Sequence, residues 1–165
     1  MVNTYKNSLY GRFSSVLDDK GRIILPSHLR RWVTPEDNVL VMTRGIDKCV
    51  FAFTLPNWDY YLHEMRNMPG DVESRLKFNR QMLAWATDCT VDLQGRVRVP
   101  QDLIEIAEIT RPVVIYGSID RIEIWAEHKF NAHLKVEDSE YNRNAMELFE
   151  NQAPDRRKNQ FPSNN

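Results

Sequence analysis

Two short segments of the chain combine an aspartate, a glycine and an arginine at the same spacing. The first, DDKGR, runs from Asp18 to Arg22, and the second, DLQGR, runs from Asp92 to Arg96. An arginine presents five N–H donors in a planar fork that suits phosphate oxygens or the O6/N7 edge of guanine, where a bidentate pair discriminates by roughly 1–3 kcal/mol. An aspartate four residues earlier can orient that fork. The pattern therefore indicates a binding site for anions or bases that contains two arginines.

The other residues of these segments complete the candidate site. A glycine before each arginine allows a positive φ angle and a close approach of the backbone to a ligand. Gln94 stands where the first segment has the cation Lys20, and a glutamine can hydrogen-bond to phosphate or adenine. The candidate site consists of Asp18, Lys20, Gly21 and Arg22 in the first segment, and Asp92, Gln94, Gly95 and Arg96 in the second.

A simpler interpretation of the same residues stays open. The glycines can merely close turns, and the two Asp–Arg pairs can be ion pairs that fix the ends of strands. The two interpretations are compatible, because an ion pair that fixes a strand end also orients its arginine. A hydrolase with Asp18 and Asp19 as paired carboxylates is a poorer fit, since Leu93 occupies the place of Asp19 in the second segment.

Both segments belong to a longer internal repeat. At an offset of 74 residues the Asp, Gly and Arg of the motif recur, together with a proline (Pro26 and Pro100) and a leucine (Leu29 and Leu103). Self-similarity at a fixed offset indicates a duplicated protein. We therefore predict a first half at 8–86, a second half at 87–150 and a disordered polar tail at 151–165.

The elements that must position the two segments follow from hydrophobic patterning and turn residues. Strand-like residues 10–17 and 22–25 flank the turn at Asp18–Gly21, which predicts a local β-hairpin. A proline then suits the first turn of a short helix. Further elements are expected as strands at 39–43 and 49–53, helices at 56–68 and 71–85, strands at 87–91 and 96–99, a helix at 100–107, strands at 112–116 and 121–125, and helical segments to about 150.

Composition narrows the class of protein. The formal net charge of −1 and the pI near 6.4 exclude a polycation that coats nucleic acid by bulk charge, although residues 1–35 hold six basic side chains against two acidic ones. Arg30 and Arg31 fit a solvated helix face that can join a phosphate-contacting surface through its proximity to the first segment. Cys49 and Cys89 are expected to be buried free thiols in a reducing cytosol.

Other kinds of site find little support in the sequence. His128 and His133 are five residues apart and so miss the i, i+4 spacing of a helical zinc pair. No phosphate-binding glycine loop or nucleophile motif occurs, and no run of apolar residues is long enough for a membrane span. We expect neither catalytic residues, nor a metal, nor a cofactor, nor a membrane, and aromatic residues such as Trp58 and Trp125 should lie in the core or at an interface.

The sequence LYGRFSSVLDDKGRIILPSHLR, followed by DLQGRVRVP, resembles the MraZ family of transcriptional regulators. The resemblance covers residues 8–150 and implies an α+β fold of two AbrB-like swapped-hairpin β-barrel units, paired about a pseudo-twofold axis, with additional helices. It also implies chains that assemble into rings, and DNA contacts in the paired D-x-x-x-R loops, here Asp18 to Arg22 and Asp92 to Arg96.

These observations predict a sequence-specific DNA-binding regulator of transcription. The resemblance implies a cytoplasmic, nucleoid-associated repressor of the division and cell-wall gene cluster that binds repeated promoter elements. An antitoxin-like or structural module that uses the same fold to bind a protein partner is the alternative. Salt separates the two, because binding through several DNA phosphates weakens steeply as ionic strength rises.

Overall fold

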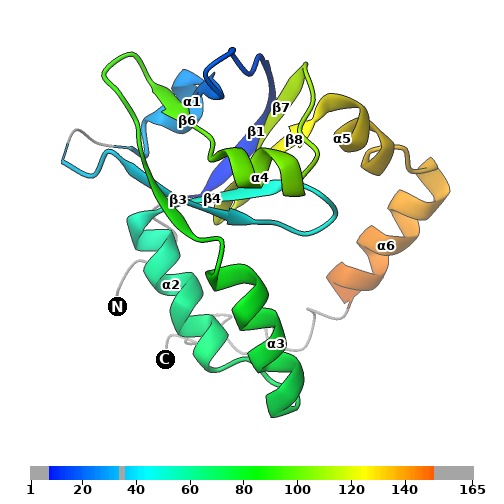
Figure 1. Cartoon of the computed structure of the whole chain (residues 1–165). Coiled ribbons are helices and arrows are strands. Elements are labelled where there is room, and N and C mark those ends of the chain that lie inside the picture. Colours follow the sequence, from blue (N-terminus) through cyan, green and yellow to red (C-terminus); the bar gives the residue numbers. More distant parts are fainter. Residues whose placement is uncertain (1–7, 34–35, 151–165) are drawn as a thin grey trace, which may run out of the picture. The chain divides into compact units, whose positions relative to one another are not determined.

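The computed structural model describes residues 8–33 and 36–150, so the tail at 151–165 lies outside the described residues. The elements follow the expected order closely (Figure 1). They are β1 (Leu9–Ser15), β2 (Arg22–Ile24), α1 (Ser27–Arg30), β3 (Val39–Arg44), β4 (Val50–Thr54), α2 (Leu55–Arg66), α3 (Val72–Leu83), β5 (Thr87–Thr90), β6 (Arg96–Arg98), α4 (Gln101–Ile106), β7 (Val113–Ile119), β8 (Arg121–Ala126), α5 (Glu127–His133) and α6 (Asp138–Glu150).

The strands interleave the two halves of the chain. Six of them form an antiparallel sheet in the order β1-β7-β8-β4-β3-β5, and the other two form a ribbon in which β2 pairs with β6. Strands β1 to β4 come from the first half and β5 to β8 from the second. If each strand is replaced by its equivalent in the other half, the result is the same strand order read from the opposite edge of the sheet. The two halves are therefore related by a pseudo-twofold axis. The fold is α+β with duplicated units, as expected.

The prediction that β1 and β2 pair with each other as a local β-hairpin is wrong. Strand β1 pairs with β7, with Phe13 opposite Ile115, while β2 pairs with β6. The turn itself forms, since the Gly21 N–H donates to the Asp18 carbonyl at 3.0 Å. Turn residues determine where the chain reverses, but the backbone donors and acceptors of a strand are the same for any partner. The second copy supplies the partners instead.

The β2–β6 ribbon lies across the pseudo-twofold axis. Ile23 and Val97, which are equivalent in the two copies, face each other at its centre, and both are fully buried. The flanking pairs are Arg22 with Arg98 and Ile24 with Arg96. Because side chains alternate along a strand, these four residues share the ribbon face opposite to Ile23 and Val97. That face carries three arginines and points away from the core.

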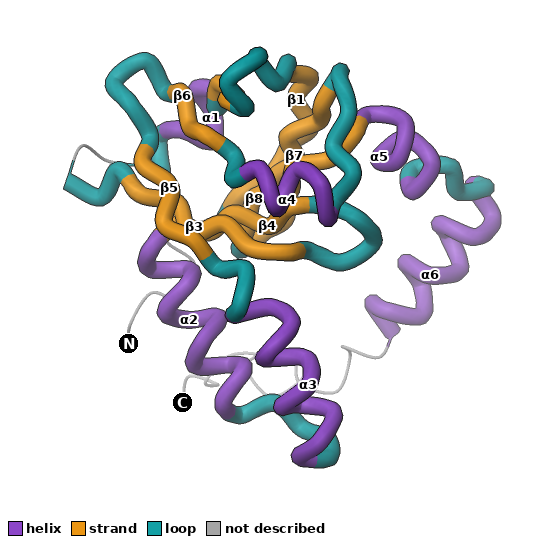
Figure 2. Tube along the Cα trace, viewed as in Figure 1, coloured by secondary structure: helices purple, strands orange, loops and turns teal. Residues whose placement is uncertain are grey.

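A core lies on each face of the six-stranded sheet. In β4, Val50 and Ala52 join one apolar cluster, while Phe51 and Phe53 join the other. The first cluster includes residues of the ribbon, α1 and α4, and the second includes residues of α2, α3 and α5. Figure 2 shows α2 and α3 on one side of the sheet and α1, α4 and β6 on the other. The ribbon therefore closes the first core.

The helices begin where the sequence predicts. Asp71 caps α3, because its carboxylate accepts the Ser74 N–H at 2.9 Å, and Pro26 and Pro100 directly precede α1 and α4. Residues 131–150 belong to a separate unit, in which α6 exposes apolar side chains such as Met146 and Phe149. No helix within 8–33 and 36–150 is long and apolar enough to cross a membrane.

Candidate nucleic-acid interface

The first D-x-x-x-R segment forms a loop organised by a single carboxylate. Oδ1 of Asp18 accepts the backbone N–H groups of Lys20 at 2.9 Å and of Arg22 at 2.8 Å. Oδ2 accepts the Nε and Nη2 groups of the Arg22 guanidinium, both at 2.8 Å. The backbone closes the loop, since the Asp18 N–H donates to the Arg22 carbonyl at 2.9 Å. Asp18 thus shapes the loop and orients the arginine at its end.

The second loop repeats this geometry almost bond for bond. Oδ1 of Asp92 accepts the backbone N–H groups of Gln94 and Arg96, each at 2.9 Å, and Oδ2 accepts Nε of Arg96 at 2.7 Å. In addition, Nη2 of Arg96 donates to Oε1 of Gln94 at 3.1 Å. Gln94 therefore helps to orient the arginine in this loop, a role that Lys20, which has no acceptor, cannot have in the first.

Hydrogen bonding lowers the pKa of both aspartates. For Asp18 the largest cause is the backbone N–H of Arg22, followed among the lowering causes by the Arg22 guanidinium, and Asp92 stands in the same relation to Arg96. Both carboxylates are therefore ionised well below neutral pH. The ion-pair interpretation of the two motifs is confirmed, and the same bonds hold each guanidinium at a defined angle.

Each loop is bonded to the residue directly after the strand that follows the other loop. The Leu25 N–H donates to the Gly95 carbonyl at 2.9 Å, and the Val99 N–H donates to the Gly21 carbonyl at 2.9 Å. Both glycines have a positive φ angle, +73° at Gly21 and +79° at Gly95, which L-residues rarely adopt. The two glycines therefore close the loops and also join them to the ribbon, one at each end.

The structure brings all eight candidate residues to this ribbon and its two loops. Arg98 of β6 adds a third arginine to Arg22 and Arg96, since it lies directly opposite Arg22. The Asp19 carboxylate accepts Nη2 of Arg111 at 2.6 Å, which fastens the first loop to the segment before β7. Arg111 escaped the sequence interpretation because nothing in its neighbourhood indicates that it lies beside residue 19.

Arg30 lies at the second loop and not at the first, which it follows in the sequence. It follows the first loop in the chain, but its Nη2 donates to the carbonyl of Leu93 in the second loop. Arg31 lies instead over the ring of Trp32, with the guanidinium carbon 5.1 Å from the ring centroid. Of the two neighbouring arginines, only Arg30 is thus placed at a candidate loop.

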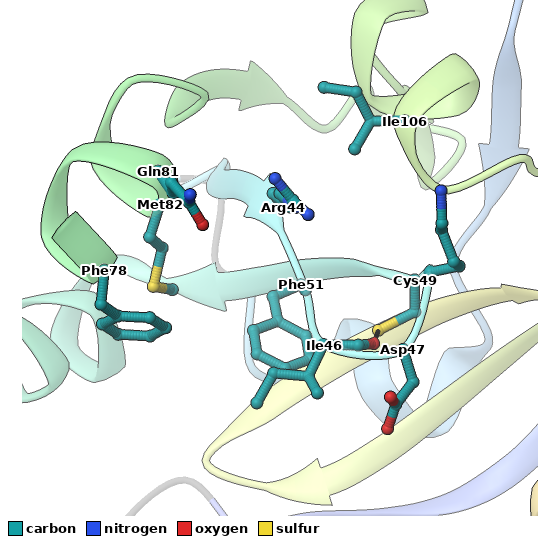
Figure 3. Close-up of a pocket in the computed structure, with 11 residues that line it drawn as sticks. Arg44, Ile46, Asp47, Cys49, Phe51, Phe78, Gln81, Met82 and Ile106 are labelled. Carbon is teal, nitrogen blue, oxygen red and sulfur yellow. Dashed lines mark hydrogen bonds between the residues drawn. The ribbon is translucent and has the colours of Figure 1, made fainter. Parts of the chain in front are cut away.

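The described part of the chain also contains an open pocket of about 420 Å³ away from the two motifs. Figure 3 shows its lining, which comes from the β3–β4 turn, from α3 through Phe78 and Met82, and from Ile106 of α4. Cys49 borders the pocket, and its thiol donates to the Ile46 carbonyl at 3.0 Å. Burial raises the pKa of this thiol far above its ordinary value, so it stays protonated and is a poor nucleophile.

The buried thiols and aromatic residues lie as the sequence predicts. Cys49 and Cys89 are free and buried, and burial also raises the pKa of Cys89, to about 11. Trp125 is buried in the second core, and Trp58 is partly buried and packs against the same core. No cluster of three or more His, Cys, Asp or Glu side chains suited to a metal ion occurs within the residues that the structure describes.

Comparison of the sequence with known proteins finds its matches in one family. A family model described as "MraZ protein, putative antitoxin-like" matches residues 9–79 and 82–151, once for each half. The protein "Transcriptional regulator MraZ" of Caldicellulosiruptor bescii is 36% identical over 142 residues, which cover 86% of this chain and 97% of that protein. A protein of the same name from Natranaerobius thermophilus is 33% identical over 140 residues, covering 85% and 96% respectively.

Proposed function

Because the chain belongs to the MraZ family, we propose that it is a DNA-binding regulator of transcription that contacts double-stranded DNA through its two Asp–Arg loops. One observation carries this proposal. The two loops share the hydrogen bonds from two backbone N–H groups and the arginine Nε to the aspartate, and they lie at opposite ends of one ribbon, whose outward face presents Arg22, Arg96 and Arg98. The major groove of B-DNA admits a two-stranded β-ribbon, and arginine is the commonest reader of its guanines.

The residues of each loop have distinct roles in this proposal. Arg22 and Arg96 contact base edges or phosphates, while Asp18 and Asp92 fix the angle of the two guanidinium groups. Lys20 adds a phosphate contact in the first loop. Gln94 steadies Arg96 and can hydrogen-bond to a base or phosphate, and Gly21 and Gly95 let the backbone approach the duplex closely.

The regulatory setting follows from the family and remains a proposal for this chain. The protein acts in the cytoplasm, associated with the nucleoid, as a repressor of the division and cell-wall gene cluster. Its repeats at 8–86 and 87–150 form one DNA-binding unit, and several chains assemble into a ring that binds repeated promoter elements. Linked binding units gain effective concentration for tandem sites, and spacing near one helical turn keeps these sites on one face of the duplex. The protein acts without a cofactor and is not an enzyme.

A second candidate function is an antitoxin-like module that binds a protein partner, which the description of the family as antitoxin-like favours. The two functions differ in their dependence on salt. Each phosphate contact lowers the slope of log K against log salt concentration by about 0.9, so DNA binding through several phosphates weakens steeply between 50 and 200 mM salt. A protein partner bound through apolar contacts shows no such slope.

Substitution of the two loop arginines tests the proposal. A promoter fragment recovered by binding selection from genomic DNA serves as the probe in a gel-shift assay. Arg22→Ala and Arg96→Ala should each weaken binding by about 1–3 kcal/mol, or roughly 5- to 150-fold. Melting temperature and size-exclusion profile should stay near those of the unchanged protein, because each Asp keeps its two backbone donors.

Arg80→Ala provides the matched control. Arg80 is an exposed arginine of α3, so the substitution removes the same charge far from the ribbon and should leave binding unchanged. Full affinity for the promoter in the protein that carries both Arg22→Ala and Arg96→Ala would rule out the two loops as the DNA-binding site.

A further inference from the structure

The two ends of the ribbon differ in the cations that the sequence supplies. At offset 74, Lys20 is replaced by Gln94, and Arg98 takes the place of Ile24. The register then gathers the basic residues at one end, because Arg98 lies opposite Arg22, beside the first loop. The first end thus holds Lys20, Arg22 and Arg98.

The second end has a single cation from its own loop and strands. Arg96 lies opposite Ile24, which is 59% exposed, and Gln94 is uncharged. A duplex that contacts both ends of the ribbon would therefore meet two fewer positive charges here. A third difference in a basic residue occurs at this end, because residue 30 is an arginine while its equivalent, residue 104, is an isoleucine.

Both residues of this third pair pack on the loop of the opposite half. Ile104 of α4 approaches Gly21, where a Cβ atom would lie 3.4 Å from its Cδ1. Arg30 of α1 covers Gly95 more tightly, since a Cβ atom there would lie 2.9 Å from both Cδ and Nη1 of Arg30. The guanidinium also donates to the Leu93 carbonyl through Nη2. This bond places a positive charge at the loop.

We infer that Arg30 is a DNA phosphate contact of the second loop, supplied by the first half of the chain. This inference rests on the proposed function and extends it to a residue outside the D-x-x-x-R motif. The arginine is only partly buried, and a guanidinium has five N–H donors, so the bond to Leu93 fixes its position and leaves donors for a phosphate. Arg30 thereby offsets the absence of a lysine at position 94.

A purely structural role for Arg30 predicts a different result. If its bond to Leu93 only steadied the loop, its loss would lower the melting temperature and weaken binding equally at all salt concentrations. Loss of a phosphate contact instead changes the salt dependence itself. The slope of log K against log salt concentration becomes less negative by about 0.9. It also weakens binding to specific and random duplexes alike, since phosphates carry no sequence information.

The test measures duplex binding by fluorescence anisotropy from 50 to 200 mM salt, with the selected promoter fragment and a random duplex as probes. Arg30→Ile, which copies the equivalent residue Ile104, should make this slope less negative by about one for both probes. Arg30→Lys should retain the slope, because an ammonium group also binds phosphate. Arg31→Ile removes the same charge from the neighbouring residue and should leave the slope unchanged.

The outcomes separate this inference from the proposed function. An unchanged slope in Arg30→Ile, together with lost binding in the protein that carries both Arg22→Ala and Arg96→Ala, would overturn the role of Arg30 alone. A slope that becomes less negative by as much in Arg31→Ile as in Arg30→Ile would also overturn it. Failure of the unchanged protein to bind either duplex would overturn both proposals. Thermal melts of each variant show that any loss does not come from unfolding.

Discussion

Leu25 donates its backbone N–H to the carbonyl of Gly95 at 2.9 Å, although the two residues belong to different halves of the chain. Val99 and Gly21 form the equivalent bond, also at 2.9 Å. Each loop is therefore built by one half and bonded to the other half, directly after its ribbon strand. This reciprocal attachment means that the two loops form one structural unit, and that a change in one half can disturb the site of the other.

The loop aspartates should matter for DNA binding through orientation rather than charge. In the protein that carries both Asp18→Asn and Asp92→Asn, the amide can still accept backbone N–H groups, but it no longer offers a carboxylate to both Nε and Nη2 of Arg22. We expect affinity for the promoter duplex to fall by about 1.5–3 kcal/mol, as for a lost hydrogen bond to a charged group. Anisotropy titration measures this loss.

Asp19→Asn is the control for charge alone, since the Asp19 carboxylate bonds Arg111 and no loop arginine of the D-x-x-x-R motifs. Removing a negative charge near DNA should strengthen binding slightly. If the double variant gains affinity as Asp19→Asn does, the aspartates do not orient the arginines for DNA.

The same two aspartates should give the fold an acid-sensitive contribution to stability. Their pKa values are lowered in the folded state, chiefly by the backbone N–H groups of Arg22 and Arg96. A lowered pKa stabilises the folded protein above the ordinary carboxyl value near 4, and this stabilisation is lost as the pH falls through the folded-state values. The free energy of unfolding should therefore fall more steeply below about pH 4 in the unchanged protein than with Asp18→Asn and Asp92→Asn combined.

Urea denaturation at intervals from pH 6 to pH 2 measures this difference. The two curves should converge at the acid end, where the native carboxyls are protonated. Parallel curves over the whole range would show that the two aspartates do not have lowered pKa values.

The two loop glycines should respond differently to a methyl group. Gly21→Ala and Gly95→Ala both place an L-residue at a positive φ angle, which costs about 1–2 kcal/mol. At Gly95 the new Cβ also meets Arg30 at 2.9 Å, whereas at Gly21 it meets Ile104 at 3.4 Å, an ordinary contact. We expect similar losses of unfolding free energy, but a greater loss of DNA affinity in Gly95→Ala. Equal affinities in the two variants would contradict this prediction.

The bond between β3 and α3 should be important for stability and irrelevant to DNA binding. Oγ1 of Thr43, a fully buried side chain, donates to the Met82 carbonyl at 2.5 Å. Thr43→Val keeps the shape of the side chain but removes this donor, which should cost about 1–3 kcal/mol of unfolding free energy. Chemical denaturation and anisotropy titration of the same variant check both statements, and a large loss of DNA affinity in the folded variant would contradict the second.

Neither thiol should react in the folded protein. Burial raises the pKa of Cys89 to about 11 and that of Cys49 further, and only the thiolate reacts rapidly with disulfide reagents. A colorimetric thiol assay should detect almost no reaction at pH 7.5 in native protein and two thiols in denaturant. Rapid labelling of native protein would show that one cysteine is accessible as a thiolate.

The sequence by itself determined most of the local structure and the composition of the site. The hydrophobic periodicity, the prolines before α1 and α4 and the cap at Asp71 act within a few residues, so the strands and helices lie close to the predicted ranges. The repeat likewise identified both loops, because Asp18 and Asp92 bond donors that are two and four residues away in the chain.

Only the tertiary structure decided which strands pair and which side chains meet across the two halves. The hydrogen-bonding edge of β2 suits any strand, and the partner is β6, because that pairing buries Ile23 against Val97 and closes the core. For the same reason Arg30 belongs to the second loop and not to the first. Contacts between residues far apart in sequence leave no local pattern, so the pseudo-twofold packing of the halves, and with it the distribution of charge between the loops, became visible only in the folded chain.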